Sequence, residues 1–298
     1  MISATSMELI VSFSSAPSVA ARRRMLSRRW EPLFIAGWLR VLMMHFEVDV
    51  DALQRDVPFQ LDLYQGRAFL TLVAFTMRGM RPRWGGKPAA WLFRPLATHH
   101  FLNVRTYVRQ GGEPGIHFLT EWVSSRLAVK LGPTAFGLPY RHGQIDYNHN
   151  WPSGVVSGQV TDINSDKKLA YHAELTESAD FHAFQPCPTD SLDEWLMERY
   201  TAFNSAGGRK RFFRVWHPPW PQQTVNATVL DNSLLTHNWS WFGEAKLVRA
   251  NFSPGFDEVW MGRPHRVNHL KSSPCMWSAM SERSDESNGG GGSRTLVP

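Results

Sequence analysis

The sequence predicts an α+β protein in which mainly antiparallel strands form a barrel or cone, with helices on its outside. Residues 37–48 are apolar on both alternating faces, which is typical of a strand buried between two layers. Two further alternating segments, 101–109 and 115–122, flank the Gly-Gly turn at 111–112, and residues 155–175 have the pattern of a meander. Strands joined by such short turns form antiparallel sheet, so we expect a curved sheet around a core.

The 298 residues are expected to form one domain with a poorly ordered segment at each end. Residues 1–28 are rich in Ser, Ala and Arg and read as a basic leader. Residues 268–298 contain a run of four glycines and resemble a linker without a core. The barrel domain is therefore predicted over residues 29–267, a length that β-barrels commonly reach as single domains.

Three elements are predicted between the strand at 37–48 and the strand at 101–109. Residues 49–54 predict a short helix that begins at the capping residue Asp49 and ends before Pro58. Residues 59–63 and 67–78 predict a hairpin around Gln65 and Gly66. Residues 81–99, with three prolines and a Gly-Gly pair, predict a long irregular connection.

The second half of the chain alternates short helices with strands. Residues 124–131 and 191–200 have helical spacing, the second with Leu192, Trp195, Leu196 and Arg199 on one face behind the capping residue Ser191. The sequence His-Pro-Pro-Trp-Pro ends a strand rigidly, so His217 is expected to be held in one direction. Strands are expected at 143–151, 212–216, 223–230 and 244–252, with a return to the sheet at 255–262.

Charge and cysteine usage exclude several classes of protein. Residues 1–29 hold five arginines and one acidic residue, whereas the rest holds 27 basic and 25 acidic residues. Because the net charge of +6 is concentrated in this short arm, we expect no nucleic-acid partner. No apolar run reaches spanning length, so no membrane partner is expected. Cys187 and Cys275 form no C-x-x-C pair and no secretion signal precedes them, which favours a reducing cytoplasm.

A polar face is the main candidate for a site. Asn103, Arg105 and Tyr107 alternate with Val104, Thr106 and Val108, so a period of two places the polar trio on one face of a strand. If that face looks into a barrel, it lines a cavity. His45 and Glu47 also share a face, and they belong either to this cavity or to a hydrogen-bonded core.

Motifs around this strand carry a family resemblance. Asn-Val-Arg-Thr-Tyr-Val (103–108), Ser-Ser-Arg-Leu-Ala-Val (124–129) and Phe-Gly-Leu-Pro-Tyr (136–140) resemble the YqjF-like family, a family of unknown function. Phe-Thr-Met-Arg-Gly (75–79) and His-Pro-Pro-Trp-Pro (217–221) belong to the same pattern, which covers about residues 29–267. That family is similar in fold to acetoacetate decarboxylase, so the resemblance implies the barrel predicted above.

The resemblance also implies what this chain lacks. In the decarboxylase, the segment like Gly137-Leu138-Pro139 continues into two lysines, the first of which forms a Schiff base. The matching residues here are Tyr140 and Arg141, and a tyrosine cannot form an imine. Lys130 lies on the preceding helix, well before these positions. Decarboxylation through an imine is therefore not expected.

The remaining polar residues suggest a small acidic ligand. Two or three arginines around one cavity suit a carboxylate, Tyr140 is a candidate general acid, and Glu121 is a candidate base if burial raises its pKa. We expect a small carboxylate or carbonyl acid and lyase, hydratase or isomerase chemistry. The candidate catalytic residues are Tyr140 and Glu121, and the candidate binding residues are Arg78, Asn103, Arg105, Tyr107 and Arg126.

Two alternatives stay open at this point. One is a non-catalytic module that holds a similar ligand. The other is a structural protein in which Glu121 neutralises Arg105 or Arg126 and nothing is bound. No G-x-G-x-x-G, Walker, H-E-x-x-H or G-x-S-x-G motif occurs, and the histidines are scattered, so no cofactor and no metal are expected.

Overall fold

The strands of the computed structural model, which describes residues 15–176 and 183–269, form one connected sheet. They are β1 (Phe34–Val48), β2 (Gln60–Leu61), β3 (Ala68–Pro82), β4 (His99–Gln110), β5 (Glu113–Val123), β6 (Tyr140–Asn148), β7 (Val155–Asp162), β8 (Lys168–Leu175), β9 (Thr201–Ala206), β10 (Arg209–Trp216), β11 (Gln223–Asp231), β12 (Lys246–Met261) and β13 (His265–Arg266).

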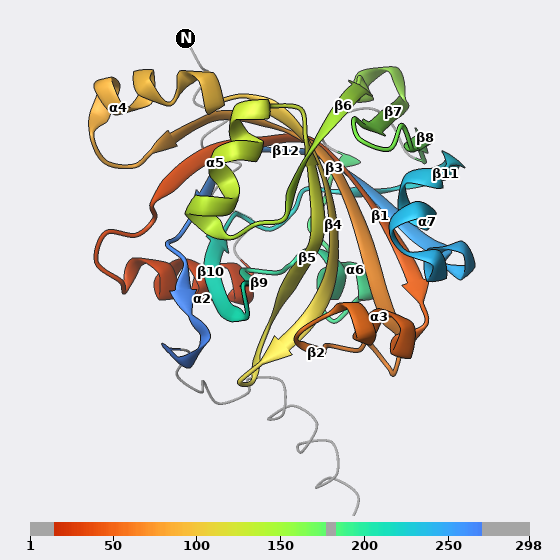
Figure 1. Ribbon diagram of the computed structural model, residues 1–298, viewed down its shortest axis with the longest axis horizontal. Helices are drawn as coiled ribbons and strands as arrows, with labels where there is room; N and C mark the ends of the chain where they lie inside the picture. The colour runs from red at the N-terminus through yellow and green to blue at the C-terminus, as the bar shows by residue number, and fades with distance from the viewer. Residues whose placement is uncertain (1–14, 177–182, 270–298) are drawn as a thin grey trace, which may run out of the picture.

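The helices are short and lie around this sheet (Figure 1). They are α2 (Ala16–Leu26), α3 (Val50–Asp56), α4 (Gly86–Leu92), α5 (Arg126–Phe136), α6 (Leu192–Met197) and α7 (Ser233–Asn238), with 3-10 turns η1 (Arg94–Leu96), η2 (Trp151–Ser153), η4 (Ser240–Glu244) and η5 (Val267–His269). Among the residues described, no helix has both the length and the apolar character needed to cross a bilayer.

The sheet closes on itself in two ways. A large circuit runs through β12, β1, β3, β4, β5, β6, β7, β8 and β11, and a small circuit runs through β12, β1, β3, β4, β5, β9 and β10. β5 pairs in parallel with both β6 and β9, whereas the other strand pairs are antiparallel. The predicted α+β fold, a mainly antiparallel barrel with peripheral helices, is therefore confirmed.

The two circuits have β12, β1, β3, β4 and β5 in common, which we call the shared wall. Side chains alternate along it between two cores, so Leu42 and Met44 of β1 pack inside the large circuit while Val41 and Met43 pack inside the small one. All four side chains are almost completely buried. The expectation that residues 37–48 are buried on both faces is confirmed by this arrangement.

The prediction that residues 59–63 and 67–78 pair with each other as a hairpin is wrong. Gln65 and Gly66 do form a turn, with φ of 51° and 78°. However, β2 pairs with β4 through Leu61 and Val108, while β1 and β4 occupy the two edges of β3. The turn chemistry was recognisable in the sequence, but the longer strands determine which edges are paired. Residues 81–99 likewise differ from the expected irregular connection, since they contain α4 and η1.

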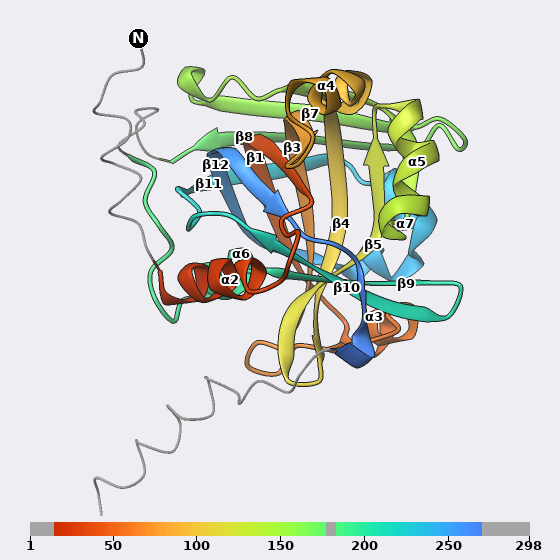
Figure 2. The ribbon, with the colours of Figure 1, turned by 90° about the vertical axis from the view of Figure 1, so that its left-hand side faces the viewer.

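The leader also differs from expectation over residues 15–28. Ser15 caps α2, and Ser18, Ala21 and Met25 are buried where this helix packs on β10 (Figure 2). Ser18 Oγ donates a hydrogen bond to the carbonyl of His217 at 2.8 Å. The buried positions have helical spacing, but the intervening arginines hide this pattern in the composition. The rest of the two expected tails, 1–14 and 270–298, lies outside the described residues.

Candidate functional site

A cavity of about 90 Å³ lies inside the small circuit. Most of its wall is aromatic or aliphatic, with Trp38, Phe75 and Trp220 among the larger side chains. Four of the predicted site residues line it: Asn103, Arg105, Glu121 and Tyr140. Asn103 and Arg105, two residues of the predicted polar trio on β4, therefore face this cavity.

Strand register brings three of these residues together. Asn103 on β4 lies opposite Glu121 on β5, and Glu121 lies opposite Tyr140 on β6. Because neighbouring residues in register project to the same side of a sheet, their side chains form one row across three strands. The Gly-Leu-Pro segment before Tyr140 fixes this register, since the Pro139 carbonyl accepts a hydrogen bond from the Glu121 amide at 3.1 Å.

Arg105 is a buried cation that forms no ion pair within the described part of the chain. Its side chain is 6% exposed, and its Nη2 contacts the Leu196 carbonyl at 3.4 Å and Met43 Sδ at 3.7 Å. Its Nε has no hydrogen-bond partner, and no carboxylate of the described residues forms an ion pair with it. Burial lowers the pKa of Arg105, and Tyr107 partly offsets this effect. Because an unpaired buried charge is costly, this guanidinium is a candidate binding group for an anionic ligand.

Glu121 is also buried, but unlike Arg105 it is uncharged. It is 3% exposed, and its Oε1 has no hydrogen-bond partner in the described part of the chain. Burial raises the pKa of Glu121 to about 8, so the carboxyl group is protonated at pH 7. Burial and the nearby Glu121 raise the pKa of Tyr140 well above its usual range. No ion pair joins Glu121 to Arg105 or Arg126 in the regions described, so the salt-bridge alternative is not observed.

Asn103 and Tyr107 have different roles although they share a face. No hydrogen bond of the Asn103 side chain is observed in the described regions, and its Oδ1 is buried. The Tyr107 hydroxyl donates to the Leu196 carbonyl at 2.9 Å and contacts Thr71 Oγ1 at 2.6 Å. Thr71 Oγ1 in turn contacts His45 Nδ1 at 2.8 Å. Tyr107 therefore belongs to a hydrogen-bonded core behind the cavity, and its expected place as a binding residue is not supported.

Two more of the predicted binding residues, Arg78 and Arg126, lie outside the cavity. Arg78 is exposed and pairs with Asp257 at 2.7 Å, because β3 extends beyond the barrel and ends near solvent. Arg126 is exposed at the first turn of α5, on the same outer side as the exposed Leu127. The expectation that both arginines point inward was therefore wrong.

Arg199 lines the cavity, although the sequence analysis placed it on an apolar helical face and not among the candidate site residues. Its Nη1 pairs with Asp62 Oδ2 at 2.9 Å, its Nε donates to the Trp195 carbonyl at 2.7 Å, and its guanidinium lies 4.2 Å from the centre of the Trp195 ring. The signal was a charged residue on an otherwise apolar helical face. Unlike Arg105, this arginine has an internal carboxylate.

His217 is the second lining residue whose place was not predicted. His217 is 2% exposed, and its ring stacks on the rings of Tyr200 and Phe256 at centroid distances of 4.8 and 5.4 Å. Nδ1 is 2.7 Å from the Pro218 carbonyl. Burial lowers the pKa of His217 to about 4, and nearby Arg105 adds to this effect. The His-Pro-Pro-Trp-Pro segment therefore holds a neutral histidine in one orientation.

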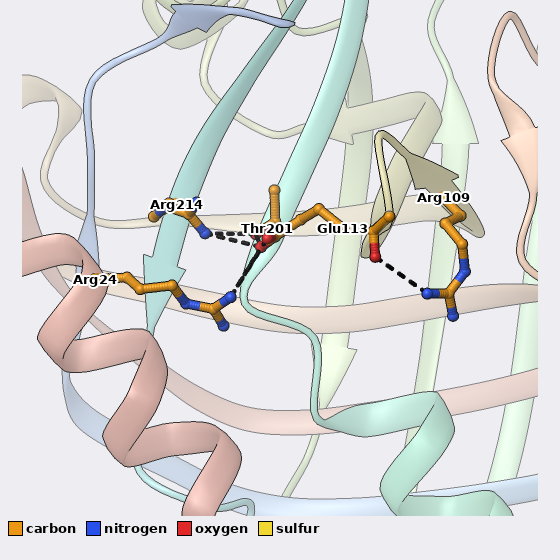
Figure 3. Close-up of polar contacts among 6 residues, drawn as sticks. Arg24, Arg109, Glu113, Thr201 and Arg214 are labelled. Carbon is orange, nitrogen blue, oxygen red and sulfur yellow. Dashed lines mark hydrogen bonds and ion pairs between the residues drawn. The ribbon is translucent and has the colours of Figure 1, made fainter. Parts of the chain in front are cut away.

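A buried ion cluster supports the wall beside the cavity (Figure 3). Glu113 Oε1 accepts hydrogen bonds from Thr201 Oγ1 at 2.7 Å and Arg214 Nη1 at 2.8 Å, and Arg24 Nη1 lies 3.3 Å from Glu113 Oε2. Arg109, also drawn in Figure 3, donates to the Gly112 carbonyl at 3.2 Å. Since Thr201 lines the cavity, the cluster fixes this wall and ties it to α2.

Within residues 15–176 and 183–269, no group of three or more His, Cys, Asp or Glu side chains is arranged to hold a metal ion.

Comparison with known proteins identifies the family. Residues 36–254 match the family model DUF2071, described as an uncharacterised conserved protein. This chain belongs to that family. It is also similar to the uncharacterised protein YqjF of Bacillus subtilis (strain 168), with 34% identity over 201 residues, covering 66% of this chain and 78% of YqjF. The resemblance of the motifs at 103–108 and 136–140 to this family is confirmed.

Solved structures similar to this DUF2071 member show the fold. An acetoacetate decarboxylase-like enzyme from Sphingomonas wittichii RW1 has 14% identity and a TM-score of 0.53, covering 81% of this chain and 94% of its own. The decarboxylase from Legionella pneumophila has 12% identity and a TM-score of 0.52, covering 86% and 97%. The enduracididine biosynthesis enzyme MppR, complexed with pyruvate, has 14% identity and a TM-score of 0.54, covering 79% and 90%.

Proposed function

We propose that the cavity binds a small carboxylate or carbonyl acid and that Arg105 binds its carboxylate group. The observation that carries this proposal is the burial of Arg105 without an ion pair to any carboxylate in residues 15–176 and 183–269. A guanidinium and a carboxylate match in a two-pronged hydrogen bond, and both charges are satisfied when the ligand enters. The free Nε of Arg105 is one donor for such a pair.

The rest of the cavity favours a ligand of this size and chemistry. A volume of about 90 Å³ is far below that of sites for drug-sized molecules and suits a few heavy atoms. Neutral Glu121 and Tyr140 can each donate a hydrogen bond to a carbonyl oxygen, and the Asn103 amide lies beside them. MppR, a protein of similar fold, has been solved in complex with pyruvate, which is a precedent for a carbonyl acid as a ligand of a protein with this fold.

The chemistry that fits is a lyase, hydratase or isomerase reaction that does not use a lysine imine. Tyr140 and Arg141 follow the Gly-Leu-Pro segment, and Arg141 is exposed. The mostly apolar wall also suits a protein that holds such an acid without turnover, and measurement of product formation separates the two cases.

The proposal predicts a specific effect of Arg105→Met. This change keeps apolar bulk in the cavity, so the variant should fold, but it should not be stabilised by acids. In a thermal-shift panel of small keto and hydroxy acids, an acid at a hundred times its dissociation constant should stabilise the parent by about 2.7 kcal/mol.

Arg78→Met is the matched control, because Arg78 is an exposed arginine outside the cavity. It should respond to acids as the parent does. If no acid stabilises the parent and Arg105→Met unfolds it, Arg105 has a structural role and the binding proposal fails.

A further inference from the structure

We propose that His217 is the base and Glu121 the acid for removal of a C–H proton beside the carbonyl group of a bound keto acid. This rests on the proposed function, since Arg105 has to hold the acid in the cavity. It assigns to the site an enolisation activity that can be measured even when the natural ligand is not known.

The hydrogen bond of His217 determines which ring nitrogen is available. The Pro218 carbonyl, 2.7 Å from Nδ1, can only accept a hydrogen bond, so Nδ1 carries the proton. In a neutral imidazole the other nitrogen, Nε2, is then a lone-pair acceptor. His217 lines the cavity, so a ligand bound there contacts the side chain that carries this lone pair.

Several contacts hold the ring in this orientation. The backbone of His217 is fixed by Ser18, whose Oγ donates to its carbonyl at 2.8 Å. The neighbouring Trp220 amide donates to Glu198 Oε1 at 2.8 Å, which holds the segment after the histidine. A preorganised base loses little freedom when the substrate binds.

The two groups have opposite protonation states at neutral pH. Burial lowers the pKa of His217 to about 4, so its ring is unprotonated, and raises the pKa of Glu121 to about 8, so its carboxyl is protonated. Groups whose environments separate their pKa values in this way suit an acid–base pair. The Pro218 carbonyl, which accepts the hydrogen bond of Nδ1, raises the pKa of His217 and would stabilise the imidazolium formed in the reaction.

The proposed step is balanced without a further reactant. His217 Nε2 takes a proton from the carbon next to the keto group, and the C–H electron pair forms a carbon–carbon double bond. The carbonyl electron pair moves to the keto oxygen, which takes the proton of Glu121. The products are an enol, an imidazolium and a carboxylate. Reversal in D₂O, after exchange of these protons with solvent, places deuterium on the carbon.

The test follows the proton NMR signals of pyruvate and 2-oxobutyrate in D₂O. The parent protein should speed the loss of the C3 proton signal relative to buffer. His217→Asn keeps a donor for the Pro218 carbonyl but lacks the base, and Glu121→Gln keeps a hydrogen-bond donor but lacks the transferable proton. Each should slow exchange by about 10²-fold or more while acid-induced stabilisation is retained.

His172→Asn is the control, because His172 lies on β8 away from the cavity lining, with its side chain 41% exposed. It should exchange protons as the parent does. If the acids stabilise the parent but exchange is no faster than in buffer, the acid–base pair is refuted while the binding proposal stands. Exchange that persists in both folded variants also refutes it. If His217→Asn does not fold, the exchange rate of Glu121→Gln decides by the same criterion. If no acid stabilises the parent protein, the binding proposal itself is refuted.

Discussion

Glu121 couples the stability of the protein to pH. Its pKa is raised by burial from 4.5 to about 8, so the folded protein keeps a proton that the unfolded chain releases. Between these two values the folded state binds more protons than the unfolded state, and stability falls as pH rises. The contribution of the neutral carboxyl is therefore fully present below about pH 4.5 and is lost as the pH approaches 8.

Replacement of Glu121 by Gln should remove this dependence. The free energy of unfolding of Glu121→Gln minus that of the parent should increase from pH 5 to pH 8, by on the order of a few kcal/mol. Urea unfolding of both proteins at the two pH values measures the change. All other titrating groups are common to the two proteins, so a constant difference would show that Glu121 is ionised in the folded state.

At the scale of elements, α5 and β6 approach each other closely at one glycine. A Cβ on Gly132 would lie 2.2 Å from Cε2 and 2.4 Å from Cδ2 of Tyr140. Because Gly132 has no side chain, the Tyr140 ring can pack directly against the helix. The ring also contacts Phe101, with centroids 5.8 Å apart, so it has a neighbour on either side.

Gly132→Ala should displace Tyr140. Alanine is the better helix former by about 1 kcal/mol, yet overpacking costs about 1–3 kcal/mol, so we expect a net loss of stability and of acid-induced stabilisation. Gly243→Ala is the matched control, because no atom lies within 4 Å of the Cβ that it would add. Thermal unfolding with and without a stabilising acid measures both effects. A stabilised Gly132→Ala protein with unchanged ligand response would contradict this packing.

These elements also show what the sequence could predict. Alternation along residues 37–48 and 101–109 is a local property, and it correctly placed Asn103 and Arg105 on one inward face. Partner choice is not local. Leu61 pairs with Val108, and Thr201 reaches the cavity wall because β9 pairs with β5. Arg78 shares the apolar strand pattern of β3, and its exposure depends on where the barrel ends.

At the scale of the whole molecule, α2 joins parts of the chain that are distant in sequence. Ser18 donates to the carbonyl of His217, and Arg24 contacts Glu113 on β5. Met25 is completely buried at 0% exposure. The helix thus supports the wall around the cavity, although its composition predicted a poorly ordered leader.

Removal of residues 1–28 should therefore destabilise the protein. Met25→Ala by itself should lower the free energy of unfolding by about 2–5 kcal/mol, as expected for a buried methionine. Removal of residues 1–14 serves as the control, because α2 and its capping residue Ser15 are retained. Chemical denaturation of the three variants provides the comparison. Equal stability of the parent and the protein that lacks 1–28 would show that α2 does not contribute.

The shared wall restricts how this family can diverge. Val104 packs in the core of the large circuit, and Arg105, next to it in the chain, lines the cavity of the small circuit. Deletion or insertion of one codon within β4 would exchange these two environments, placing a charge in the apolar core and a valine in the site. Changes in chain length should therefore accumulate in descendants at loops such as 111–112 and 207–208, while β1, β3 and β4 keep their length.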